Sequence, residues 1–341
     1  MRIGISGCGI RGKLFARALA SVDGVELAGM SDPDPVARER AGRAFDVPVR
    51  EDHHQLIADG LDAMVVATPD FAHREIAVDG AAAGLALMVE KPLATTTQDA
   101  QAITDAVNAA GVSCLVAFEN RWNPYFIAAK AAIDRGDLGE VVSVDAVLSN
   151  TTFVPTRMLP WSGSSSPAWF LMPHTVDLTM WLSGQRPQSV SAWGRRGELA
   201  ARGIDTLDAV HALVGLDGGG VGNLQSSWIL PETLPSIVDF RVEIAGTAGT
   251  ISINHGDQGF RSADGEKYRL HTALPVEIDG AEQSMAAWMI RSWARGLLTG
   301  EQVGPDAAHG LEVTTTVAAV HTAITAGPVH LDTSRQIGTV Q

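Results

Sequence analysis

A glycine-rich segment near the start of the chain has the spacing of a phosphate-binding turn. Gly7, Gly9 and Gly12 form a GxGxxG pattern directly after a short apolar run, Arg2–Ser6, where helical periodicity begins. Gly7 would allow the tight turn, Gly9 would let the backbone approach a pyrophosphate, and Gly12 would let helix and strand pack closely. The pattern in this context predicts a strand–turn–helix unit that binds a dinucleotide.

An aspartate after the next apolar run indicates which dinucleotide to expect. Asp32 follows Val25–Met30 and would accept hydrogen bonds from both ribose hydroxyls, while its charge would repel a 2′-phosphate. We therefore expect NAD rather than NADP, although Arg38 or Arg40 could still reach a phosphate. In the alternative, the glycines form only a turn and Asp32 only caps a helix over Pro33–Phe45.

A lysine stands where catalytic chemistry would be expected. Lys91 comes just after the apolar run Leu85–Val89, at the carboxyl end of a predicted strand, where parallel α/β sheets bind their ligands. An ammonium there could hydrogen-bond a hydroxyl group of a bound substrate and stabilise negative charge on its oxygen. The alternative is a solvated lysine paired with Glu90.

The elements that position these residues alternate between strand and helix patterns. Apolar strands alternating with amphipathic helices specify a doubly wound parallel sheet, covered on both faces. After the first two strands and two helices, the pattern continues with strands at Ala63–Ala67, Leu85–Val89 and Val112–Phe118 and helices at Ala72–Ala83 and Thr97–Ala110. We assign residues 1–120 to this Rossmann domain.

Beyond residue 120 the pattern changes to β-type composition. The expected strands are Val141–Leu148, Ser189–Trp193, Ala209–Leu216, Val221–Trp228, Val238–Ala245 and Thr250–Ile253, and the expected helices are Pro124–Arg135, Ala286–Leu298 and Ala307–Ala326. We expect residues 121–341 to form an α+β domain with a large, open, mainly antiparallel sheet flanked by helices.

Composition excludes several classes of function. The 341 residues are 45% hydrophobic and 19% charged, and the formal net charge of −14 argues against a nucleic-acid binder. No apolar run is long enough to span a bilayer, and no signal peptide is evident, so we expect a cytoplasmic protein without a membrane partner. The two cysteines and the His53–His54 pair show no zinc spacing, so no metal site is expected.

Several motifs in a fixed order carry a resemblance to a known family. They are GCGIRG at Gly7–Gly12, Ala67–Pro69 with His73, Glu90–Pro92, Asn120–Pro124, Leu138–Val141, His174 with Asp177, and Gly246–Thr250. Along nearly its whole length the chain resembles the glucose–fructose oxidoreductase / inositol dehydrogenase / MocA family. The resemblance implies NAD(P)-dependent oxidation or reduction at a carbinol carbon of a sugar, polyol or related cyclic compound. It also implies that residues 121–341 are a substrate-binding and oligomerisation domain, with a cleft between the two domains and dimers or tetramers formed through the second sheet.

The resemblance also implies site residues. Lys91 would hydrogen-bond the substrate hydroxyl, and His174 would be the proton acceptor. The cofactor would be bound by Gly7, Gly9, Ile10, Arg11, Gly12, Asp32, Thr68, Pro69, His73, Glu90 and Lys91. The substrate would be bound by Lys91, Arg121, Trp161, Phe170 and His174. The alternatives are a buried or capping role for His174, a structural clamp for Arg121, and core packing for the aromatic residues.

One position departs from the family pattern. Many members carry an aspartate four residues before the catalytic histidine, and this chain has Phe170 there, which cannot accept a proton. Pro173 predicts in addition that a helix starts near His174. The change would mean a more apolar substrate, a different proton route, or no catalysis. In the last case the chain would be a sensor or regulatory protein that binds a dinucleotide and a sugar-like ligand.

Overall fold

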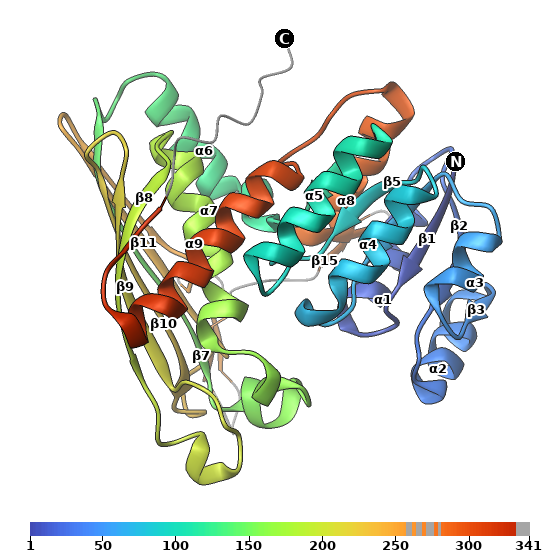
Figure 1. Cartoon of the computed structure of the whole chain (residues 1–341), viewed down its shortest axis with the longest axis horizontal. Helices are drawn as coiled ribbons and strands as arrows, with labels where there is room; N and C mark the ends of the chain where they lie inside the picture. The colour runs from blue at the N-terminus through green and yellow to red at the C-terminus, as the bar shows by residue number, and fades with distance from the viewer. Residues whose placement is uncertain (257–260, 264–267, 271–275, 279–280, 332–341) are drawn as a thin grey trace. The chain divides into compact units, whose positions relative to one another are not determined.

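The computed structural model (Figure 1) describes residues 1–331 except 257–260, 264–267, 271–275 and 279–280. Its contacts divide it into two compact units. The first holds residues 1–122 and the described part of 274–314, and the second holds the described part of 123–273 and of the segment from 315 onward. No helix in the described residues is long and apolar enough to cross a membrane.

A six-stranded parallel sheet organises the first unit, in the order β3-β2-β1-β4-β5-β6. Its strands are β1 (Arg2–Ser6), β2 (Glu26–Ser31), β3 (Val49–Arg50), β4 (Ala63–Val66), β5 (Ala86–Val89) and β6 (Cys114–Val116). Strand order reverses between β1 and β4, and such sheets bind ligands beyond the carboxyl ends of strands at this point. The predicted doubly wound Rossmann sheet is therefore confirmed.

The helices of this unit follow the predicted alternation. They are α1 (Ile10–Leu19), α2 (Pro35–Phe45), α3 (His53–Ala58), α4 (His73–Ala82) and α5 (Thr97–Ala110), with short 3₁₀ helices η1 (Asp70–Ala72) and η2 (Glu119–Trp122). The predicted start of α2 is wrong: Asp34, not Asp32, caps it by accepting from the Val36 N–H, and Pro35 occupies the first turn. The segment offers two Asp–Pro pairs in succession, so the capping pattern alone could not choose between them.

A segment from late in the sequence completes the first unit. After a two-stranded sheet of β15 (Val276–Ile278) and β16 (Ala281–Gln283), α8 (Met285–Thr299) packs against α1 and η2. Ile290 and Trp293 of α8 join the core that contains Phe15. The first expected boundary lies near the observed one, but the second domain was expected to run unbroken from residue 121 to 341. Hydrophobic periodicity shows that α8 has an apolar face but not which core that face joins.

The second unit is built on a seven-stranded sheet, in the order β12-β11-β7-β10-β9-β8-β17. Its strands are β7 (Val141–Thr151), β8 (Pro187–Arg195), β9 (Ala209–Leu216), β10 (Val221–Leu230), β11 (Val238–Gly246), β12 (Thr250–Asn254) and β17 (Val329–His330). All pairs are antiparallel except β7 with β10, so the predicted mainly antiparallel sheet is confirmed. β13 (Arg261–Ala263) and β14 (Tyr268–Leu270) pair separately.

One helix covers a face of this sheet. α7 (Pro167–Ser183) contacts β7, β9 and β10. The remaining helices of the described residues are α6 (Pro124–Asp134), α9 (Ala307–Ala326), the π-helix η3 (Val154–Met158) and the 3₁₀ helices η4 (Ser162–Ser164) and η5 (Ala200–Arg202). The expected helix start near His174 is wrong. Ser166 caps α7 and Pro167 occupies its first turn, while Pro173 lies inside the helix. The extensive burial of α7 offsets the backbone hydrogen bond that Pro173 cannot make.

A histidine packs against the capped start of α7. His321 of α9 stacks on Trp169 with ring centroids 5.1 Å apart, and its Nε2 lies 3.1 Å from Ser166 Oγ. The Ser166 Oγ accepts from the Trp169 N–H, so its hydroxyl proton is available to His321 Nε2 as acceptor. Burial, with Arg196 adding to it, lowers the pKa of His321 to about 4. The fold therefore favours the neutral ring.

This lowered pKa predicts acid sensitivity of the second unit. Between pH 6.5 and about 4 the unfolded His321 binds a proton and the folded one does not, so stability contributed by this site falls as pH falls through that window. Thermal unfolding of His321→Gln should depend less on pH across this window than that of the wild type. His211→Gln, at an exposed histidine of β9, is the control. Equal pH dependence in His321→Gln and wild type would contradict the assignment.

Candidate functional site

The glycine turn is shaped by close approaches at two positions and by open space at a third. A Cβ on Gly7 (φ +105°) would lie 2.4 Å from the Ala67 carbonyl oxygen, and one on Gly12 would lie 1.8 Å from the Gly7 carbonyl oxygen. A Cβ on Gly9 would meet no described atom within 4 Å. Gly7 and Gly12 are therefore required for packing, whereas Gly9 leaves the start of α1 open to a ligand. Ile10, the first residue of α1, is mostly exposed.

The Asp32 carboxylate is held beside this turn. One of its oxygens accepts from the Cys8 N–H at 2.8 Å, and the other accepts from the Asp34 N–H at 2.9 Å. Because Asp34 caps α2, Asp32 is left half-buried at the end of β2, where a ribose would be bound. The Arg38 Nη1 donates to the carbonyls of Asp32 and Pro33, so its position is fixed by backbone contacts.

His73 joins the two loops that follow β4 and β5. Its buried ring places Nδ1 2.9 Å from the Pro92 carbonyl oxygen and Nε2 3.1 Å from that of Thr68. This geometry makes His73 a positioning residue for both loops. The Thr68 Oγ1 is buried and has no hydrogen-bond partner among the described residues, so it is available to a bound group next to Pro69. The glycine turn, Asp32 and Thr68 together fit a dinucleotide.

A partly buried ion-pair cluster holds the segment after β5. The Arg11 Nε lies 2.5 Å from Glu90 Oε1, and its Nη1 lies 2.8 Å from Glu119 Oε2. The guanidinium also lies 4.8 Å from the centroid of the Phe15 ring. Arg11 and Glu90 were expected to contact the cofactor, and the structure shows them in contact with each other. Glu119 could not be identified from the sequence, because only the fold places it beside Arg11.

Lys91 follows directly on this cluster. Its N–H donates to Glu90 Oε2 at 3.1 Å, and the Lys91–Pro92 peptide bond is cis. Burial lowers the pKa of the Lys91 ammonium; Arg11 adds to this effect, and the Glu90, Glu119 and Asp70 carboxylates oppose it. An ammonium with a lowered pKa at the carboxyl end of β5 is suited to exchange a proton with a bound hydroxyl.

Arg121 contacts a residue that is distant in the sequence, as a structural clamp would. Its Nη2 lies 2.9 Å from His309 Nε2, and the His309 ring meets the edge of Phe118 with centroids 5.7 Å apart. Since a guanidinium only donates, Nε2 accepts. This contact ties η2 to the start of α9 within the first unit and favours the alternative left open for Arg121.

The remaining expected site residues lie in the second unit. Phe170 packs between Trp161 and the buried Trp228, with ring centroids 6.1 Å and 5.8 Å away respectively. His174 lies one turn further along α7 and is half-buried, on the same side of the helix as Phe170. The structure thus brings Trp161, Phe170 and His174 to one region of this unit. An aromatic cluster occupies the position of the expected carboxylate.

Comparison with known proteins places these two units in a family. Residues 1–118 match the model "Oxidoreductase family, NAD-binding Rossmann fold", and residues 126–252 match "GFO/IDH/MocA C-terminal domain". The chain belongs to the GFO/IDH/MocA family. The expected family, fold class and cofactor are confirmed, and this family member is an NAD-binding oxidoreductase.

Similar proteins share most of the chain. Scyllo-inositol 2-dehydrogenase (NAD(+)) of Bacillus subtilis is 27% identical over 82% of this chain and 84% of its own. Inositol 2-dehydrogenase 2 of Saccharopolyspora erythraea is 30% identical, over 74% and 73% respectively. The crystal structure of scyllo-inositol dehydrogenase from Lactobacillus casei, with bound NAD(H) and scyllo-inositol, has a TM-score of 0.81 at 18% identity and covers 97% of this chain and 98% of its own. This last likeness bears on the fold alone.

The different surroundings of the glycines predict different effects of alanine. Gly9→Ala should have the melting temperature of the wild type, because the added Cβ meets open space. Its affinity for NAD should fall at least roughly tenfold, because the methyl group occupies the space through which the pyrophosphate approaches the backbone. Gly12→Ala should instead be destabilised, by about 2 kcal/mol or more. Calorimetric titration measures the NAD affinity of each variant and thermal unfolding measures its stability, with Gly42→Ala in α2 as the control. Unchanged NAD affinity in Gly9→Ala would contradict the proposed approach.

Proposed function

We propose that this protein transfers a hydride between NAD and a carbinol carbon of an inositol, a sugar or a related cyclic polyol. The observation that carries the proposal is Lys91, an ammonium with a lowered pKa that is held at the carboxyl end of β5 by the Arg11–Glu90 ion pair. Support for the substrate class comes from the two inositol dehydrogenases above and from levoglucosan dehydrogenase of Pseudarthrobacter phenanthrenivorans, which is 26% identical over 75% of this chain.

The residues of the first unit would hold the cofactor and the reacting oxygen. The first-turn N–H groups at Gly9 and Ile10 would bind the pyrophosphate, and Asp32 would accept from the ribose hydroxyls. Bound NAD supplies the acceptor for the hydride that leaves the carbinol carbon. The Lys91 ammonium would donate a hydrogen bond to the substrate oxygen and stabilise its charge as the C–H bond breaks.

The second unit would supply the proton acceptor. In the proposed reaction the hydroxyl proton passes to the His174 imidazole as the hydride leaves, so that a carbonyl product remains. Phe170 has no group that can accept a hydrogen bond from a substrate hydroxyl, and its ring and that of Trp161 form an apolar cluster instead. We therefore propose a substrate with one apolar ring face, as sugar and cyclitol rings present. The sensor alternative gains no support from the relatives reported above, which are named dehydrogenases.

Substitution of Lys91 tests the proposed role directly. With NAD and a panel of inositols, sugars and anhydrosugars, Lys91→Ala and His174→Ala should each lose roughly a hundredfold or more in kcat, while calorimetric NAD affinity stays nearly unchanged. Lys130→Ala, which removes only an exposed ion pair with Asp134, should match the wild type. Unchanged turnover in Lys91→Ala would contradict the mechanism, and NAD binding without nicotinamide reduction across the panel would support the sensor.

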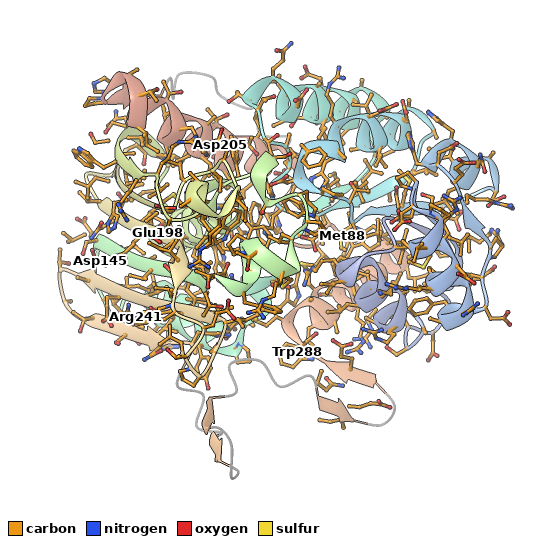
Figure 2. The ribbon with its side chains drawn as sticks, turned by 90° about the horizontal axis from the view of Figure 1, so that it is seen from below. Met88, Asp145, Glu198, Asp205, Arg241 and Trp288 are labelled. Atoms are coloured by element: carbon orange, nitrogen blue, oxygen red, sulfur yellow. The ribbon has the colours of Figure 1, made fainter. Side chains whose placement is uncertain are left out.

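We also propose a homo-oligomer formed through the open face of the second sheet. The strand register places Trp193, Leu213 and Val221 on one face, and these side chains are 65%, 45% and 41% exposed. Figure 2 shows Asp145 and Arg241 on the same sheet. The free, buried thiols of Cys8 and Cys114 fit a reducing compartment such as the cytoplasm.

The oligomer can be tested by weakening this face. Trp193→Asp should shift the sedimentation of the protein from dimer or tetramer to monomer, because the charge would be buried in the contact. Ile127→Asp, at an exposed apolar residue of α6 outside the sheet, serves as the comparison and should leave the sedimentation unchanged. A wild-type protein that sediments as a monomer would contradict the proposal.

A further inference from the structure

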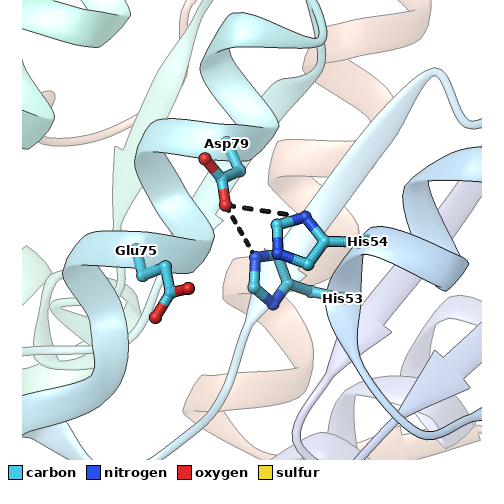
Figure 3. A group of neighbouring side chains, drawn as sticks. All are labelled: His53, His54, Glu75 and Asp79. Carbon is cyan, nitrogen blue, oxygen red and sulfur yellow. Dashed lines mark hydrogen bonds and ion pairs between the residues drawn. The ribbon is translucent and has the colours of Figure 1, made fainter.

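A cluster of metal-binding side chains lies in the first unit among residues to which the proposed chemistry gives no role. His53 and His54 begin α3, and Glu75 and Asp79 lie one turn apart on α4 (Figure 3). One potential ligand atom from each of the four lies within 4.8 Å of all the others. We propose that these four side chains bind one zinc ion that links α3 to α4.

The donor set suits this ion. Two imidazole nitrogens and two carboxylate oxygens are ligands that Zn²⁺ accepts in four-coordinate sites, whereas Mg²⁺ and Ca²⁺ prefer oxygen alone. The two carboxylates carry together the negative charge that balances a divalent cation when both imidazoles are neutral. Neighbouring ligands of a tetrahedral zinc lie roughly 3.4 Å apart, so the 2.9 Å contact between His53 and Asp79 would lengthen slightly and the longer separations, up to 4.8 Å, would contract. His54 and Glu75 are exposed and can turn towards the ion.

Half of the site is already held in place. Asp52 caps α3 by accepting from the Gln55 N–H, which fixes the backbone at the two histidines. The His53 Nε2 lies 2.9 Å from Asp79 Oδ2, and the His54 Nδ1 lies 3.7 Å from the same oxygen. Both imidazoles therefore already lie beside one carboxylate oxygen, and one cation could be bound by all three side chains.

The position of the cluster indicates a stabilising role. α3 contacts β1, β2 and β3, and α4 begins at His73, which holds the loops after β4 and β5. An ion held between α3 and α4 would therefore fasten one side of the sheet to the helix that carries His73. Spacing along the chain predicted no metal site, because the histidines and the carboxylates come from different helices and meet only in the fold.

Metal titration of the purified full-length protein, after treatment with a chelator, tests the inference. Calorimetry should show saturable binding of one Zn²⁺ per chain, and Zn²⁺ should raise the melting temperature while Mg²⁺ at the same concentration does not. His54→Ala changes an exposed side chain and should weaken zinc binding at least roughly tenfold, and Glu75→Gln should weaken it in the same direction. Neither variant should alter the affinity for NAD.

Matched controls separate this site from other histidines. His211→Ala and Glu39→Gln, both exposed and outside the cluster, should bind zinc like the wild type. Zinc binding that is unchanged in His54→Ala and Glu75→Gln, or an absence of saturable binding, would overturn the proposal and leave the cluster as a hydrogen-bonded His–Asp pair. Since NAD binding and turnover are measured separately, a negative result here would not bear on the proposed dehydrogenase activity.

Discussion

The candidate site depends on the compensation of one buried charge. The Glu90 carboxylate is almost fully removed from water, and an unpaired carboxylate there would cost several kcal/mol. Arg11 reaches it from the first turn of α1 and reaches Glu119 of η2 with the other side of its guanidinium. The start of the cofactor-binding helix, the segment after β5 and η2 are thereby fixed to one another. Lys91 takes its backbone position from the same carboxylate.

Other loops of the first unit are held by the same kind of contact, in which a side chain satisfies backbone groups. Asp32 accepts from the N–H of Cys8, Arg38 donates to carbonyls at the end of β2, and His73 faces the carbonyls of two further loops. Loops at the carboxyl ends of parallel strands cannot satisfy their backbone groups within the sheet, so side chains must do so. A ligand then meets a surface whose shape is already set.

The sequence predicted those features that local pattern determines. The alternation of strands and helices, the three glycines and the place of Asp32 after β2 all follow from spacing within a short stretch. The cap of α2 could not be chosen between Asp32 and Asp34, because both precede a proline. The continuation of α7 through Pro173 depends on how deeply the helix is buried in the tertiary structure, which the local sequence pattern does not show. Glu119, His309 and the His53–Asp79 contact depend on tertiary proximity, which spacing does not reveal.

The return of α8 to the first unit has a consequence for biosynthesis. The core around Phe15 receives Ile290 and Trp293 from a segment that the ribosome makes only after nearly all of the second unit. A nascent chain that has just completed β6 therefore exposes apolar surface for the time needed to translate the intervening residues. Folding of this unit is thus completed only late in translation. Until then, the apolar surface that the chain exposes is of the kind that chaperones bind.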